Sequence, residues 1–145
     1  MSNLFLFLLM LGGGVILTLQ PSINGRLAER VGILESAFIS FAVGTLALAV
    51  VVAACGRGSL RAAGDAAWWE LTGGLLGALF VSLTILVVPR IGTAAAMAAT
   101  IAAQLITGLL LDQLNLFGFR AIPIDGRRLA GTVLLLAGAA LIYRR

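Results

Sequence analysis

The feature that most constrains this chain is a series of five apolar stretches, each long enough, or nearly so, to cross a bilayer. A helix needs about 20 apolar residues to cross the hydrocarbon. The stretches cover residues of about 3–27, 35–55, 67–89, 92–112 and 128–143. Only 11% of the 145 residues are charged, against about 25% in a typical soluble domain. We therefore expect an all-α integral membrane protein with five transmembrane helices in a single transmembrane domain, residues 1–145.

The charged residues exclude several classes of function. All ten basic residues are arginines that stand singly or in pairs at the edges of the apolar stretches. This placement is typical of the membrane interface, and no basic face suited to nucleic acid is formed. The chain has no histidine, the commonest general base and metal ligand. We expect no enzyme, no metal and no cofactor, and we expect Cys55 to be a small buried hydrophobic residue.

The arginines are evenly divided between the two sides of the membrane. Five spans place the termini on opposite sides. The N-terminal side carries Arg57, Arg61, Arg120, Arg127 and Arg128, and the other side carries Arg26, Arg30, Arg90, Arg144 and Arg145. Because a basic bias sets orientation, an equal division predicts insertion either way up, unless the first helix supplies a subtler cue. Two oppositely inserted copies would form an antiparallel homodimer, a ten-helix bundle with an inverted repeat.

The first span contains a polar segment around a proline. Pro21 removes one helical hydrogen bond, and Gly25 follows in the same segment, so we expect a helix break here. Gln20 and Asn24 are four residues apart and share a helix face. They either form a substrate-binding elbow with freed backbone carbonyls or bind the loosened backbone of a simple kink.

Two other spans carry polar side chains at helical spacing. In the fourth span, Thr100 and Gln104 share a face, and Gln104 either lines a cavity or bonds a neighbouring helix. In the second span, Ser36 and Ser40 favour close helix packing and are weaker candidates for a cavity wall. Asp112 ends the fourth span, where it is either hydrated or paired with an arginine of the loop that follows.

No carboxylate lies in the middle of a span. Glu29 and Glu35 flank the first turn, and Asp112 lies at a span end. These three residues are candidates for coupling transport to an ion only if they lie deeper than this placement indicates. The pattern argues against a proton-driven exporter of cationic drugs, which would use a central acid.

Two segments resemble a known family. They are GGGVILTLQPSINGRLAERVGILESAFISFAVGTLAL and AAQLITGLLLDQLNLFGF, the latter followed by an Arg-Arg-Leu-Ala-Gly step. They resemble the YdcZ-type proteins of the drug/metabolite transporter superfamily. The resemblance implies a five-span half-transporter of the bacterial inner membrane, found singly, paired or fused. The motif positions that it carries over are Gln20, Pro21, Asn24, Gly25, Gln104 and Asp112.

Three functional hypotheses follow. The first is a transporter that works by alternating access as an antiparallel homodimer and binds an unknown small metabolite or amphipathic compound between its copies. The second is a dual-topology channel for a small ion. The third is a scaffold subunit of a larger membrane complex, against which the polar side chains in the spans argue.

Overall fold

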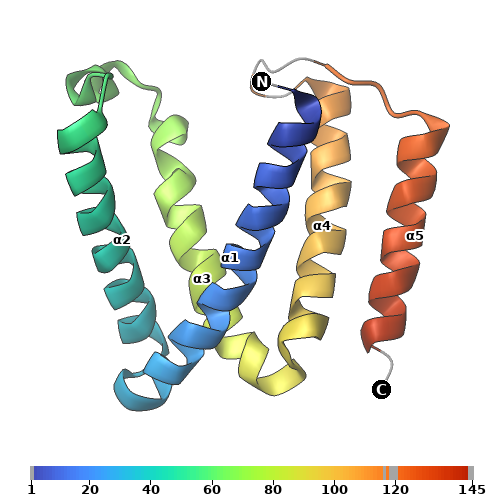
Figure 1. Ribbon diagram of the computed structural model, residues 1–145, viewed down its shortest axis with the longest axis horizontal. Helices are drawn as coiled ribbons and strands as arrows, with labels where there is room; N and C mark the ends of the chain where they lie inside the picture. Colours follow the sequence, from blue (N-terminus) through green and yellow to red (C-terminus); the bar gives the residue numbers. More distant parts are fainter. Residues whose placement is uncertain (1, 116, 118–120, 144–145) are drawn as a thin grey trace. The chain divides into compact units, whose positions relative to one another are not determined.

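A computed structural model describes residues 2–115, 117 and 121–143. Its helices, shown in Figure 1, are α1 (Asn3–Val31), α2 (Ile33–Cys55), α3 (Gly73–Ile91), α4 (Thr93–Leu114) and α5 (Gly126–Tyr143), with short 3-10 helices η1 (Leu60–Asp65) and η2 (Trp68–Thr72) between α2 and α3. Five helical segments in this described part are long and apolar enough to cross a membrane, η2 and α3 together forming the third. The prediction of an all-α protein with five spans is confirmed.

Helix α1 differs from the prediction at its proline. The helix is continuous from Asn3 to Val31 with Pro21 inside it, so the predicted break at Pro21 and Gly25 is wrong. A proline removes a single helical hydrogen bond, and residues on both sides of Pro21 continue the helix. Gly25 lies against α3 instead: a Cβ there would be 3.7 Å from the ring of Pro89. The polar segment therefore packs as part of a helix.

Single glycines end two of the long helices. Gly32 separates α1 from α2 with φ 102° and ψ 161°, and Gly92 separates α3 from α4 with φ 86° and ψ 152°. This region of backbone space is essentially restricted to glycine. An arginine, Arg30 or Arg90, stands two residues before each glycine, in the last turn of its helix. The connections are thus one-residue corners.

The chain divides into two compact units, Met1–Arg90 and Ile91–Arg145, each described here by itself. In the first unit, Ala37 of α2 packs with Val81 and Ile85 of α3, and Ala28 and Phe41 border this cluster. In the second unit, α4 and α5 pack against each other. Three of the arginines used in the orientation argument, Arg120, Arg144 and Arg145, lie outside the described residues.

Most apolar side chains lie on the surface of the structure. Helices α1 and α2 diverge from the corner at Gly32 (Figure 1), and residues 2–17 of the first unit are all exposed. Cys55, expected to be buried, is also exposed. An apolar surface of this extent requires lipid or protein to cover it.

Candidate functional site

Asn24 is the centre of a hydrogen-bonded cluster that joins α1 to α2. Its Nδ2 donates to Ser40 Oγ at 3.2 Å, and its backbone carbonyl accepts a bond of 2.7 Å from Ser36 Oγ. Ser36 is completely buried and Asn24 is 5% exposed. Because its hydroxyl is both buried and bonded, Ser36 is not accessible to a ligand, and its assignment to a cavity wall is wrong. The cluster holds two helices together.

Gln20 lies one helical turn before Asn24 and has a different environment. It is half-buried and forms no hydrogen bond with another described residue. It borders a groove of about 450 Å³ whose polar margin also includes Asn24 and Ser40. The rest of the lining is aliphatic: Ile16, Leu19, Ile23, Leu27, Ile39 and Val43. This "Gln20 groove" has no charged lining residue. It therefore suits a neutral or amphipathic molecule, or an apolar protein surface, that forms a hydrogen bond with the Gln20 amide.

A second groove lies between α4 and α5 in the other unit. It has a volume of about 370 Å³ and is lined by Gln104, Leu105, Gly108, Leu109, Asp112, Arg128, Gly131, Thr132 and Leu135. Gln104 is exposed and, like Gln20, has no hydrogen-bond partner among the described residues. Both glutamines therefore present an amide that the surrounding unit does not bond.

Asp112 forms an ion pair with Arg128 at one end of this "Gln104 groove". The two side chains are 36% and 30% exposed, respectively. Arg128 also donates from Nη1 to the carbonyl of Ile122 at 3.1 Å, and the carbonyl of Asp112 accepts from Ile122 N at 3.1 Å. Asp112 thus pairs with an arginine, one of the two alternatives left open by the sequence, although Arg128 lies in the first turn of α5 and not in the loop before it. The pair anchors the chain segment that leads into α5.

The other polar candidates are occupied or lie at helix ends. Thr100 donates to the carbonyl of Ala96 in its own helix at 2.9 Å. Glu29 pairs with Arg26 at 2.5 Å on an exposed surface. Glu35 is exposed in the first turn of α2. Nine residues of helix, about 13 Å of rise, separate Glu29 from Gln20. These positions give no support to Glu29 or Glu35 as coupling groups at the Gln20 groove.

A family profile described as "Putative inner membrane exporter, YdcZ" matches residues 5–141. The chain belongs to the YdcZ family. It is 40% identical over 78 residues to the inner membrane protein YdcZ of Escherichia coli K12, an alignment that covers 54% of this chain and 52% of the relative. The chain thus spans about half the length of the curated relative that it matches. No solved structure matches it.

Membership of the YdcZ family confirms the resemblance and places the five apolar helices in an inner membrane as a multi-pass protein. Within the described residues, no three His, Cys, Asp or Glu side chains are grouped so that they could hold a metal ion.

Some interactions in this YdcZ-family chain were missed at the level of sequence. Gln113 Oε1 accepts a bond of 2.8 Å from Ile124 N, and Asp125 Oδ1 accepts one of 2.8 Å from Arg128 N at the start of α5. The second was readable from sequence, because an aspartate just before an apolar stretch is a common helix N-cap. The first joins residues eleven apart across an irregular segment, and no local pattern indicates it.

Proposed function

We propose that this YdcZ-family protein is a transporter that moves a small metabolite or amphipathic compound across the inner membrane. It works as an antiparallel homodimer by alternating access, and the substrate binds between the two copies near Gln20, Asn24 and Gln104. The observation that supports this most strongly is a pair of amides, Gln20 and Gln104, that have no hydrogen-bond partner in the described part of the chain. Each lies in a membrane-spanning helix and borders an open groove.

An amide without a hydrogen-bond partner is unstable in lipid. Moving an amide into a medium that cannot hydrogen-bond costs about 4–8 kcal/mol. Lipid therefore cannot be the lasting environment of Gln20 or Gln104, which must face water, a ligand or a second protein surface. A hydrated cavity between two copies would supply such an environment for both residues.

The even division of arginines supports opposite orientations of the two copies. Ten helices can enclose a polar cavity, whereas five short helices barely can. The lining of the Gln20 groove, with six aliphatic side chains and no charge, favours a neutral or amphipathic substrate. Asn24 and Ser40 border this groove while bonded to each other, so they hold its shape and leave Gln20 as the amide available for a substrate.

Reactivity of introduced cysteines tests the hydrated cavity without knowledge of the substrate. Gln20→Cys and Gln104→Cys are made in a Cys55→Ser background and treated with a charged methanethiosulfonate reagent from each face of the membrane. Leu46→Cys is the control, because Leu46 is 69% exposed in the middle of α2 and would face lipid. We expect faster reaction at both test positions, from both faces. Reaction no faster than at Leu46→Cys would refute a hydrated cavity.

The orientation is tested at two positions near opposite ends of spans. Cys55, the only cysteine of the chain, is exposed at the end of α2, and Ala94→Cys in a Cys55→Ser background places a thiol in the first turn of α4. Each should be alkylated by an impermeant maleimide from both faces. Labelling of each from a single face would refute dual insertion.

A flux measurement in proteoliposomes separates this proposal from a channel. A turnover within the usual range, up to about a thousand per second, and dependence on a counter-substrate or gradient favour the transporter.

A further inference from the structure

The segment between α2 and α3 has an amphipathic composition and lies almost wholly on the surface. We call residues 56–72 the interfacial segment. Leu60 is 80% exposed, Trp68 is 79% exposed and Leu71 is 62% exposed, while Arg57 and Arg61 are interspersed with these side chains. The segment directly follows the span of α2 and ends in η2, which forms the start of the third span. Tryptophan and arginine next to span ends are characteristic of the headgroup layer, so this layer accounts for the exposed apolar side chains.

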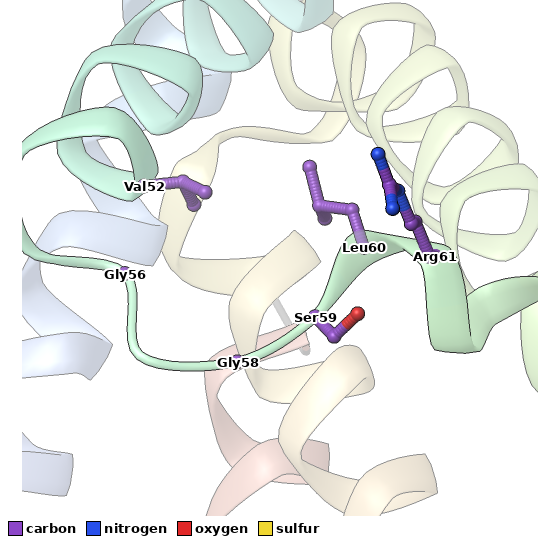
Figure 2. Close-up of a pocket in the computed structure, with 6 residues that line it drawn as sticks. All are labelled: Val52, Gly56, Gly58, Ser59, Leu60 and Arg61. Carbon is purple, nitrogen blue, oxygen red and sulfur yellow. The ribbon is translucent and has the colours of Figure 1, made fainter.

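The first half of the segment borders a hollow of about 740 Å³ (Figure 2), lined by Val52, Gly56, Gly58, Ser59, Leu60 and Arg61. Val52, in the last turn of α2, points toward the side of the loop that carries Leu60, and Arg61 stands beside Leu60. The hollow therefore combines an aliphatic wall with a guanidinium group and a hydroxyl group. This combination matches a molecule with an acyl chain and an anionic head.

The cations of the interfacial segment have no ion-pair partner in the part of the chain that the structure describes. Arg57 and Arg61 form no ion pair with any described residue, whereas Arg26 and Arg128 both do. Glu70 of the segment accepts a bond of 2.7 Å from the N–H of Ala67, and Asp65 pairs with neither arginine in the described structure. Arg61 lines the hollow, and Arg57 lies in the chain between two of its lining residues, Gly56 and Gly58. Neither guanidinium has a counter-ion among the described residues, which leaves both for an external anion.

We propose that the interfacial segment binds an anionic phospholipid, with the phosphate at Arg57 and Arg61 and an acyl chain along Val52 and Leu60. The site lies at the end of a span and contains neither Gln20 nor Gln104. The proposal is therefore independent of the transport function. Each basic residue near an anionic membrane surface contributes about 1 kcal/mol, or about fivefold in association.

A single tryptophan placed in the hollow reports the lipid that occupies it. The chain has two tryptophans, Trp68 and Trp69. Both are changed to phenylalanine, and Leu60→Trp is added. The protein is reconstituted in phosphatidylcholine vesicles that contain either brominated phosphatidylglycerol or brominated phosphatidylcholine at equal mole fraction, because the bromine atoms quench a tryptophan that they contact. Leu134→Trp in the same background is the control, since Leu134 is 72% exposed in the middle of α5.

We expect the tryptophan at position 60 to be quenched at severalfold lower mole fractions of brominated phosphatidylglycerol than of brominated phosphatidylcholine. The control tryptophan should be quenched equally by both lipids. Arg57→Gln with Arg61→Gln should abolish the preference, and the two corresponding lysine variants, which keep the charge, should retain it.

A control variant removes two positive charges at positions away from the interfacial segment. Arg30→Gln with Arg90→Gln removes the same two charges from the last turns of α1 and α3 and should leave the preference at position 60 intact. Equal quenching of position 60 by both lipids would overturn the proposal. So would a preference that survives Arg57→Gln with Arg61→Gln, or quenching of position 60 by aqueous iodide but by neither lipid.

Discussion

Gly→Ala, which stabilises an ordinary helix, should destabilise the protein when it is made at either of the two glycine corners. We consider Gly→Ala at Gly32, Gly92 and Gly138. Gly32 and Gly92 have positive φ with ψ near 155°, a region that costs a residue with a Cβ of order 1–3 kcal/mol. Gly138 lies inside α5, where Gly→Ala instead stabilises a helix by roughly 0.5–1 kcal/mol. Gly→Ala should therefore lower the free energy of unfolding at the two corners and raise it at Gly138.

The space around each glycine separates backbone strain from collision. An added Cβ at Gly92 or Gly138 has nothing within 4 Å, whereas at Gly32 it would meet the carboxylate of Glu35. That carboxylate is the end of a flexible, exposed side chain, so it can move away at small cost. We therefore expect Gly32→Ala and Gly92→Ala to destabilise by similar amounts, about 1–3 kcal/mol, with backbone strain as the common cause.

Equilibrium unfolding in mixed detergent micelles, followed by circular dichroism, measures these differences. The quantity compared is the free energy of unfolding of each variant relative to the unsubstituted protein. If Gly32→Ala or Gly92→Ala is as stabilising as Gly138→Ala, the corner geometry is incorrect. A loss confined to Gly32→Ala would assign the effect to the Glu35 collision and refute the argument from backbone strain.

Three further predictions concern packing and charge. Ser36→Val should destabilise the protein by about 1–3 kcal/mol, because it overpacks a completely buried contact. Ser82→Val is the control in the same unfolding assay and should have a smaller effect, because Ser82 is half-buried and bonded to its own helix. Asp112→Arg alone should destabilise by about 1 kcal/mol or less, and adding Arg128→Asp should restore part of the loss, which a double-mutant cycle measures. Asp65→Arg adds one positive charge to the N-terminal side, so the native cysteine should become accessible to maleimide mainly from the cytoplasmic face, and unchanged labelling from both faces would contradict the charge argument.

The spans were predictable because their signals are local. An apolar stretch of some 20 residues is sufficient to indicate a spanning helix. The continuity of α1 through Pro21 was not predictable, because the missing hydrogen bond is local but the packing that keeps the helix continuous is not. Pro21 is almost completely buried, and the next turn of α1 is bonded to Ser36 and Ser40 of α2.

The roles of the polar residues were harder to predict for the same reason. Gln20, Asn24 and Gln104 are all amides within spans, and composition does not distinguish an amide that finds a partner from one that does not. Asn24 is bonded to Ser40, sixteen residues away, and this contact depends on how α1 and α2 meet. Local spacing showed that Gln20 and Asn24 share a face, but it could not show that a single one of them would be bonded.

The corner at Gly32 explains why these two amides differ. Asn24 lies eight residues before the corner and Ser40 lies eight residues after it, so the two meet across the helix pair. Gln20 lies twelve residues before the corner, and the matching position on α2 is Gly44, where an added Cβ would have nothing within 4 Å. The helices have diverged by this turn (Figure 1), and Gly44 offers no side chain to bond or fill the space. The geometry of the helix pair thus gives Asn24 a bonding partner on α2 and gives Gln20 none at the matching position, so the difference between the two amides follows from where each lies relative to the corner.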